Sequence, residues 1–379
     1  MRISLVKTTP LLVPYKQPFH WAQGIIHSAG VILVEVHTDE GIVGIGECIA
    51  TPSAEAVQMY LKLCEEICLG CSPFANARLM DECYHTLFKA YGTNSAPRFS
   101  GQVLAGLEMA LWDTMGKVTG HAVHELLGGA VRDEILYFGF PQGDKPEEIA
   151  AQASLMAENG HDVIYVKVGR GDALDIEIAR QVRSAIGPEK RLRVDPNEHW
   201  SPIRATRMIR KMVEFDVDMV EQPTHCESVS ALAQVRASSP AAIAADQLVF
   251  TPFNAFDVCR EKAADMIVLG LHETGGINRF RKIANIAEAA GIDICIHGLY
   301  ETGITTIASN HVAATLPNLD DGNQFMNHLL EWDIVKKPNL KLKQGQLPVL
   351  PGPGFGIDID DDAIAQATEE YIKAKRANQ

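Results

Sequence analysis

The chain has 379 residues, of which 46% are hydrophobic and 22% charged, with 30 Gly and 19 Pro. This composition excludes disordered, collagen-like and coiled-coil proteins. The formal net charge of −14 disfavours nucleic acid and anionic membranes as partners. No run of 18 apolar residues occurs, and Pro10 and Pro14 come before a signal-peptide core could form, so we expect a cytoplasmic protein.

The eight cysteines lack the spacing of a disulfide framework. Cys64, Cys68 and Cys71 could be taken for part of an iron–sulfur or zinc site. They lie in SAEAVQMYLKLCEEICLG, which has the periodicity of an amphipathic helix. No further Cys or His pair follows at the spacing of a zinc finger, so we favour a role in the core.

The first 130 residues predict an α+β module. Residues 1–50 alternate like antiparallel strands, and AGVILVEVHTDEGIVGIGECIA is typical of a hairpin. Residues 53–128 have helical periodicity and end in VHELLGG, where the glycines close the last helix. We interpret 1–130 as the N-terminal part of a capping domain.

Short apolar runs then alternate with helical stretches at the spacing of one βα unit. The runs are 135–140, 162–168, 191–195, 217–222, 241–246, 265–271 and 292–297. Such a series favours a parallel barrel over an open doubly wound sheet, and no glycine-rich phosphate turn follows the first run. We assign 131–330 to the barrel, and we expect 331–379 to return in extended form over the first module.

Charged side chains end four consecutive runs of this barrel. Alternation puts Tyr165 and Lys167 inward in the second run, and the next three runs end in Asp195, Glu221 and Asp246. Three carboxylates at one barrel edge would repel each other unless a cation lay between them, which predicts a Mg²⁺ site. The alternative is that each acid caps a helix or pairs with an Arg, but the regular series favours the metal.

Longer motifs resemble the enolase superfamily, in its mandelate racemase and muconate lactonizing enzyme branch. They are RVDPNEHW, VEQP and the segment 105–129, AGLEMALWDTMGKVTGHAVHELLGG. The resemblance implies a modified (β/α)7β barrel, similar to a TIM barrel, under an α+β cap built from both chain ends. It also implies abstraction of the proton α to a carboxylate, with Mg²⁺ stabilising the enediolate.

The resemblance assigns roles to individual residues. Lys167 matches the second lysine of the family's Lys-x-Lys, the usual base, and Tyr165 stands in place of the first. Asp195, Glu221 and Asp246 match the metal ligands. Asn197, in the first of these motifs, is expected to contact the substrate.

The sixth and seventh runs depart from the family pattern. Gly270 stands where the family has a lysine or an aspartate that supports a histidine, so no base and no supporting carboxylate is expected there. His272, two residues beyond Gly270 and on the same inward face, is a candidate catalytic residue that reaches the site from just beyond the end of the run. His297 aligns with the histidine of the racemase group, and Glu301 with a glutamate of the muconate lactonizing group. Without a supporting carboxylate, His297 is expected to donate a proton rather than act as a strong base.

In this family, loops of the cap close over the ligand, here 18–28 and 49–55. His20 and Trp21 are therefore candidates for substrate specificity. The alternative is an ordered aromatic in the contact between cap and barrel.

These assignments favour a dehydratase of hydroxy acids or acid sugars, or a cycloisomerase, acting on a small carboxylate. One alternative is a racemase or epimerase that uses Lys167 and His297 on opposite faces of the substrate. Another is a metal-binding homologue that has lost catalysis. By analogy with its relatives, we expect a homo-oligomer.

Overall fold

The computed structural model describes residues 1–89 and 97–377. The capping domain starts with an antiparallel sheet in the order β1-β2-β3. Its strands are β1 (Ile3–Trp21), β2 (Gly24–Thr38) and β3 (Val43–Ile49). Leu11 and Val13 of β1 are fully buried and alternate with less buried residues, so one face of the sheet packs on the core.

The segment 18–28 is not the loop that the sequence analysis expected. Phe19 pairs with Ile26, and Trp21 pairs with Gly24, so β1 and β2 continue to a tight turn at the hairpin tip. Phe19, Trp21, Ile25 and Ile26 are residue types that favour strands, so FHWAQGIIHS suits a strand as well as a loop, which explains the error.

The cap helices cover this sheet. They are α1 (Ala54–Cys68), α2 (Asn76–Cys83), α3 (Pro97–Thr119) and α4 (Val123–Leu126), with short turns η1 (Pro73–Ala75) and η2 (Tyr84–Phe88). Ser53 caps α1 by accepting a hydrogen bond from the Ala56 backbone, as an N-cap serine does. Cys64 and Cys68 are fully buried in the apolar cluster under α1, which agrees with the core interpretation.

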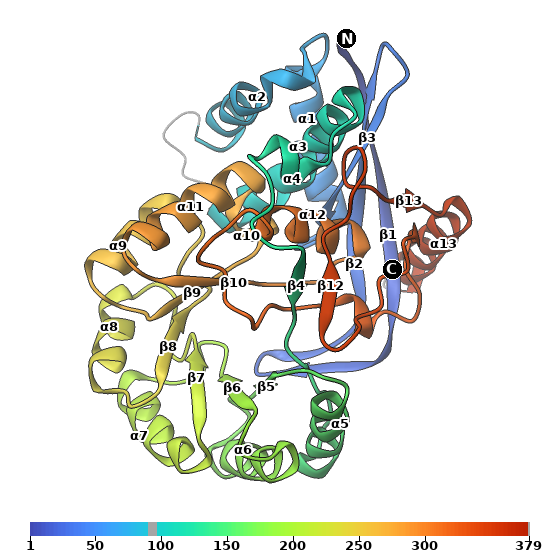
Figure 1. The fold of residues 1–379 in the computed structure, drawn as a ribbon. Coiled ribbons are helices and arrows are strands. Elements are labelled where there is room, and N and C mark those ends of the chain that lie inside the picture. The colour runs from blue at the N-terminus through green and yellow to red at the C-terminus, as the bar shows by residue number, and fades with distance from the viewer. Residues whose placement is uncertain (90–96, 378–379) are drawn as a thin grey trace.

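The barrel contains a six-stranded parallel sheet in the order β10-β9-β8-β7-β6-β5 (Figure 1). The strands are β5 (Val163–Lys167), β6 (Arg191–Asp195), β7 (Val217–Glu221), β8 (Ala242–Ala245), β9 (Met266–Leu269) and β10 (Asp293–Ile296). Met219, Ala244, Val268 and Cys295 form a separate buried cluster that fills the interior. Because every pairing is parallel, the carboxyl ends of all six strands meet at one edge.

Two irregular segments close the ring. Gly139 bridges to Ile164 of β5, Leu319 bridges to Ile294 of β10, and Tyr137 bridges to Asn323, each in parallel. Only the start of the predicted run 135–140 is a regular strand, β4 (Glu134–Leu136), and it pairs antiparallel with β12 (Gln346–Pro348). The barrel is therefore TIM-like, with the first and eighth positions held by isolated bridges.

Helices lie outside the strands and follow them in the chain (Figure 1). Ser201, Ser228, Thr251 and Thr302 each cap the helix that follows by accepting a backbone hydrogen bond. The helices are α5 (Pro146–Glu158), α6 (Asp172–Ile186), α7 (Pro202–Met212), α8 (Val229–Ser238), α9 (Pro252–Arg260), α10 (Leu271–Thr274), α11 (Ile277–Ala289) and α12 (Gly303–Ala313), with turns η4 (Val213–Phe215) and η5 (Asn327–Leu329).

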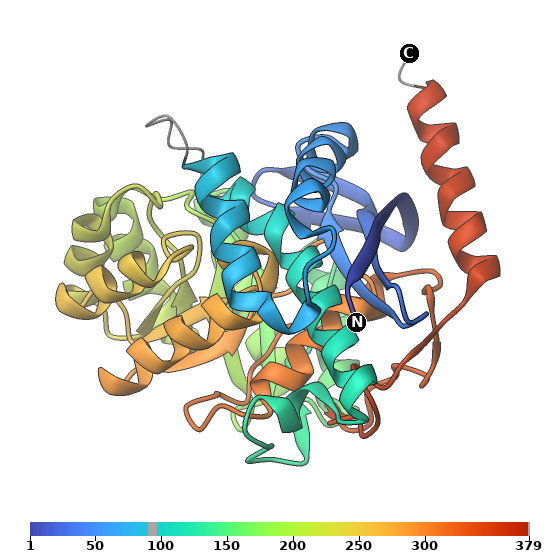
Figure 2. The same ribbon diagram turned by 90° about the horizontal axis from the view of Figure 1, so that it is seen from above.

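The C-terminal segment returns to the cap. Strand β11 (Val335–Lys337) pairs with β13 (Asp358–Ile359), and the helix α13 (Asp361–Ala377), which the sequence analysis did not anticipate, lies beside β1 (Figure 2). Lys375 and Tyr371 of α13 both contact the Glu55 carboxylate of α1. Among the described residues, no helix is long and apolar enough to cross a lipid bilayer.

Candidate active site

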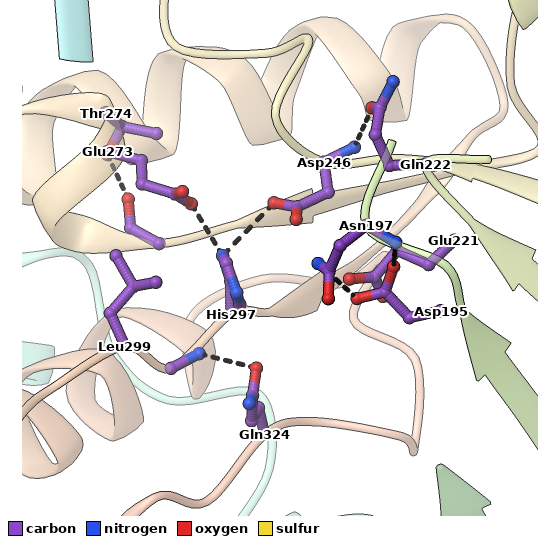
Figure 3. A network of polar contacts seen from close by, with 12 residues as sticks. Asp195, Asn197, Glu221, Gln222, Asp246, Glu273, Thr274, His297, Leu299 and Gln324 are labelled. Carbon is purple, nitrogen blue, oxygen red and sulfur yellow. Dashed lines mark hydrogen bonds and ion pairs between the residues drawn. The ribbon is translucent and has the colours of Figure 1, made fainter. Parts of the chain in front are cut away.

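Three carboxylates lie at the carboxyl edge of the barrel, where the sequence placed them. Asp195 and Glu221 are the last residues of β6 and β7, and Asp246 follows β8 directly. All three are buried. Figure 3 shows Asp195 and Glu221 close together, with Asp246 between this pair and Glu273.

Two side chains of β5 face this group. Lys167 Nζ donates to Asp195 Oδ2 at 2.5 Å. Tyr165 Oη lies within hydrogen-bond distance of two carboxylates, 2.6 Å from Asp195 Oδ2 and 2.9 Å from Glu221 Oε1, and its single hydrogen can be donated to one of them at a time. The alternation that puts both residues inward is thus present. Phe138 stacks on the Tyr165 ring, with centroids 4.4 Å apart, and so holds the phenol in place.

The electrostatics of this group depend on burial and repulsion. Burial raises the pKa of Glu221 well above its usual value, and repulsion by Asp195 and Asp246 raises it further. For Lys167, burial lowers the pKa of the amine, but attraction to Asp195 and Glu221 outweighs burial and the net pKa is raised. The carboxylates thus lack sufficient positive charge from the protein alone.

The oxygen atoms around these carboxylates fit a hard cation. Oδ2 of Asp246, Oδ1 of Asn197 and Oε1 of Gln247 are buried without a hydrogen-bond partner, and Oδ1 of Asp246 has an ion pair with His297 as its contact. Native proteins pair nearly all such buried oxygens with a donor or a cation. Carboxylate and amide oxygens are the ligands that Mg²⁺ prefers. The residues present therefore suit Mg²⁺ held by Asp195, Glu221 and Asp246.

His297 has carboxylate support, and the expectation that it has none is wrong. Its Nδ1 lies 2.8 Å from Glu273 Oε2 and 3.2 Å from Asp246 Oδ1 (Figure 3). Burial lowers the pKa of His297, but the two carboxylates outweigh burial and raise it well above its usual value. Glu273 lies in α10, three residues beyond Gly270 at the strand end, so alternation along the strand could not find it.

A small cavity opens above these groups, with a volume of about 50 Å³. Lys167, His297 and Asn197 line it from the barrel, and Trp21 lines it from the hairpin tip of the cap. His20 does not line it; this residue faces a separate hollow with Arg170 and His199. Trp21 lines this hollow as well, so it lies between the two spaces, and only Trp21 of the pair reaches the cavity.

Comparison with known proteins identifies the family. Residues 4–128 match the family described as mandelate racemase / muconate lactonizing enzyme, N-terminal domain, and residues 148–363 match the family described as enolase C-terminal domain-like. L-Ala-D/L-Glu epimerase of Bacillus subtilis (strain 168) is 31% identical over 367 residues, covering 94% of this chain and 97% of the epimerase. The chain belongs to the mandelate racemase and muconate lactonizing enzyme branch of the enolase superfamily.

Two further relatives of this enolase superfamily member show the range of reactions. Muconate cycloisomerase 1-1 of Acinetobacter lwoffii is 28% identical over 385 residues, covering 99% of each chain. A dipeptide epimerase of Enterococcus faecalis V583, solved with Mg and the dipeptide L-Leu-L-Tyr, has a TM-score of 0.87 and 27% identity, covering 94% of this chain and all of the other. These relatives are isomerases, and this chain is an enzyme of the same superfamily.

Two of the residues predicted by the resemblance lie away from the cavity of this superfamily member. His272 Nε2 lies 3.0 Å from Thr305 Oγ1, and burial lowers the pKa of its imidazole to about 3. Glu301 accepts from the Leu299 backbone and from Thr306 Oγ1, and burial raises its pKa to about 8. Neither side chain is among those that line the cavity.

Both residues instead lie near the cap–barrel seam, where α3 contacts α10 and β3 contacts α12. The sequence analysis missed Glu47 of β3, which is buried in this seam. Its carboxylate accepts from the Thr302 backbone and from the hydroxyls of Thr302 and Thr305. A lone acid in the strand VGIGECI was the available signal, because an acid on the buried face of a strand needs a partner.

Proposed function

We propose that this enzyme removes the proton α to a carboxylate of a small molecule and then delivers a proton from a second group, as a Mg²⁺-dependent dehydratase or cycloisomerase. The observation that carries the proposal is that two acid–base side chains, Lys167 and His297, line one cavity beside three buried carboxylates. They come from β5 and β10, the two end strands of the six-stranded sheet, and so reach the cavity from different walls.

Asp195, Glu221 and Asp246 would hold the ion. Mg²⁺, when bound, supplies positive charge against the second negative charge that develops on the substrate carboxylate as the α-proton leaves. Asp246, Glu273 and His297 also have ligand atoms within 4.8 Å of one another. Glu273 and His297 are already hydrogen-bonded to each other, so we assign Asp246 to the ion together with the other two carboxylates.

Lys167 is proposed as the base. Its amine lies at the end of β5, beside Asp195 and below the cavity. Positive charge bound by the same carboxylates would compete with the ammonium for Asp195, and this favours the neutral amine that a base requires. Tyr165 keeps Asp195 and Glu221 in position because its hydroxyl contacts both carboxylates.

His297 is proposed as the proton donor. An imidazole whose Nδ1 faces two carboxylates holds its proton there, which leaves Nε2 available toward the substrate. A group that keeps its proton suits assistance to a leaving hydroxyl or protonation of a new carbon centre. This favours elimination or cycloisomerisation, in which base and acid are different groups with fixed roles.

The size of the cavity limits the substrate. A volume of about 50 Å³ is far below the roughly 300–1,000 Å³ of pockets that hold drug-sized ligands. Trp21 and Phe19 of the cap, with Tyr300 and Met326 of the barrel, are among the residues that bound it. A compact hydroxy acid therefore suits this cavity better than a dipeptide with large side chains.

A second candidate is proton transfer between the two faces of one carbon, as in an epimerase. The observation that favours it is the Glu273 hydrogen bond, because a histidine that must act as a base needs a carboxylate partner. In that reaction Lys167 and His297 would each serve one stereoisomer.

The test is a screen of hydroxy acids, acid sugars and N-acyl amino acids for Mg²⁺-dependent uptake of deuterium at the α-carbon in D₂O. For a compound that exchanges, Lys167→Ala should lower the exchange rate by about 10²–10⁴-fold, the usual contribution of a positioned base. Calorimetry should show Mg²⁺ affinity near that of the wild type. Lys211→Ala, which removes an exposed lysine of α7, is the matched control. Retained exchange in Lys167→Ala would assign the base elsewhere, and no exchange with any compound would indicate a non-catalytic homologue.

A further inference from the structure

We infer that Glu273 is a positioning residue through which Arg98 of the cap fixes the orientation of His297. The inference rests on the proposed function, because it concerns the group that we propose as the proton donor.

Glu273 is the nearer of two carboxylates at His297 Nδ1; the other is Asp246, whose Oδ1 lies at 3.2 Å and which we assign to the ion. The Glu273 carboxylate lies between two cationic groups, with Oε2 at 2.8 Å from His297 Nδ1 and Oε1 at 3.4 Å from Arg98 Nη2. An ionised carboxylate can only accept, so Nδ1 must donate. Nε2 is then the nitrogen left to exchange protons with a substrate.

Gly270 makes room for this arrangement. A Cβ atom added to Gly270 would lie 2.9 Å from Glu273 Oε2. The carboxylate thus occupies the space into which a side chain at the strand end would project. Glu273 reaches that space from the first turn after β9 and takes the position that a strand-end carboxylate would otherwise fill.

Arg98 holds the second oxygen of the carboxylate. Glu273 is buried and its Oε1 has no hydrogen-bond partner, so the ion pair with Arg98 is the contact that balances this atom. The guanidinium lies 5.6 Å from the centroid of the Phe250 ring, and the side chain of Arg98 is 40% exposed. Arg98 thus comes from the cap, rests on the loop after β8, and contacts the partner of His297.

The backbone around this contact leaves little freedom. A Cβ at Gly101 of α3 would lie 2.5 Å from the Glu273 carbonyl oxygen, and a Cβ at Gly276 would lie 1.8 Å from Glu108 Oε2. Glycines at both positions therefore let α3 pack directly on α10 and the start of α11. The helix that carries Arg98 and the turn that carries Glu273 are consequently fixed relative to each other.

The competing role for Arg98 is direct binding of substrate. Its side chain lines the same cavity as Lys167 and His297, and a guanidinium suits a second carboxylate. The two roles differ in one respect: positioning acts through Glu273, whereas substrate binding does not require Glu273. An engineered route around Glu273 therefore separates them.

Gly270→Asp supplies that route. Gly270 has φ −108° and ψ 143°, an extended conformation that an aspartate adopts without strain. In the wild type, Gly270→Asp should crowd Glu273 and lower turnover. In Glu273→Ala, the same change should place a carboxylate near His297 Nδ1 and restore turnover.

The experiment measures kcat and KM for an exchanging substrate in Glu273→Ala and in the double variant Gly270→Asp/Glu273→Ala. It then adds Arg98→Gln to two backgrounds, the wild type and the double variant. Glu273→Ala should lower kcat by about 10- to 100-fold, as loss of an orienting partner does, and the double variant should recover most of it. Arg98→Gln should lower kcat about tenfold in the wild type and leave the double variant unchanged. Glu273→Gln serves as a second variant if the alanine variant does not fold.

Two outcomes would overturn the inference. An equal effect of Arg98→Gln in both backgrounds, seen mainly in KM, would assign Arg98 to substrate binding. No rescue by Gly270→Asp in a protein that unfolds like the wild type would show that Glu273 does not act by orienting His297.

A readout without substrate separates this inference from the proposed function. In protein labelled with ¹⁵N-histidine, the Nδ1 signal of His297, assigned from its loss in His297→Asn, should report a bound hydrogen in the wild type. It should change in Glu273→Ala and return in Gly270→Asp/Glu273→Ala. If no compound exchanges but these changes in the Nδ1 signal occur, the proposed function fails and the inference that Glu273 orients His297 stands. If exchange occurs but the Nδ1 signal does not change, the inference about Glu273 fails and the proposed function stands.

Discussion

The two sides of the barrel mouth take their charged groups from different places in the chain. On the metal side, at the ends of β6, β7 and β8, every acid is the last residue of its strand or the next one. On the histidine side, at the ends of β9 and β10, the strand end is Gly270 and the acid is Glu273, one helical turn later. A mouth of this kind can therefore be completed either from strand ends or from the turns that follow them.

The two sides also differ in how charge is balanced. On the histidine side, Glu273 lies between the cationic groups of His297 and Arg98, so its carboxylate is neutralised by the protein. On the metal side, the three buried carboxylates of Asp195, Glu221 and Asp246 face Lys167 and share His297 with Glu273, and Oδ2 of Asp246 has no hydrogen-bond partner. The carboxylate of Glu273 has a cationic partner at each oxygen, whereas the three acids of the metal side have fewer cationic partners than carboxylates, which is why we propose an ion there.

The strongest way to test this contrast is to remove a carboxylate from the metal side. Glu221→Gln should lower Mg²⁺-dependent exchange by on the order of 10³-fold, since a metal ion supplies several kcal/mol of charge stabilisation and about 1.4 kcal/mol is tenfold in rate. Mg²⁺ at 100 times its Kd should raise the free energy of unfolding of the wild type by about 2.7 kcal/mol, and this rise should vanish in the variant. Thermal unfolding with and without Mg²⁺ measures it.

The same substitution should make the metal-free protein more stable, because it removes one of three repelling buried acids. Glu214→Gln, an exposed acid near the start of the same strand, is the control and should change neither quantity. Unchanged Mg²⁺ affinity in Glu221→Gln would show that the metal side is not a metal site.

The contrast also explains what the sequence could and could not predict. Asp195, Glu221 and Asp246 end apolar strands, and Tyr165 and Lys167 follow period-two alternation, so their positions at the mouth could be predicted from local pattern alone. Glu273 could not, because its position depends on the turn after β9 and on the space that Gly270 leaves. His272, chosen in its place, has the inward parity of a strand, but the chain is helical there and the side chain points to Thr305.

The cap illustrates the same limit. The sequence predicted the antiparallel sheet and α1, since both have clear periodicity. It did not predict that 18–28 continues as paired strands, although this pairing is local, with Trp21 opposite Gly24. It did not predict α13 either, because this helix packs on β1, which is distant in the sequence.

On the histidine side, His297→Asn separates the two candidate reactions. Turnover should fall by about 100-fold or more, because the proton donor is lost. If the reaction is an elimination or cycloisomerisation, as we expect, Lys167 still removes the α-proton and deuterium washout from the substrate continues. Proton NMR of the recovered substrate measures the washout.

Because Glu273 gives His297 the carboxylate partner that a base needs, the structure favours an epimerase more than the sequence alone did. In that case His297→Asn should keep exchange with one epimer and lose it with the other. His225→Asn, an exposed histidine after β7, is the matched control and should behave like the wild type.

The cap–barrel seam balances a buried acid in a third way, by protonation. Glu108 of α3 is buried and accepts from the Asn278 backbone, and burial raises the pKa of its carboxyl to about 7. A raised pKa means that the folded state binds more protons than the unfolded state between the two pKa values. The free energy of unfolding should therefore fall as pH rises from the unfolded value of about 4.5 through 7.

The last and smallest expected effect is this fall in the free energy of unfolding with rising pH. For a pKa near 7 in the folded state, Glu108 should account for a loss of about 2 kcal/mol between pH 5 and pH 7, and Glu108→Gln should remove this part of the pH dependence while keeping the hydrogen bond from Asn278. Urea unfolding at both pH values measures it, with the exposed Glu82→Gln as the control. If Glu108→Gln left the pH dependence unchanged, the carboxylate would be ionised in the folded protein, and the seam would resemble the histidine side, with Arg279 as the balancing charge.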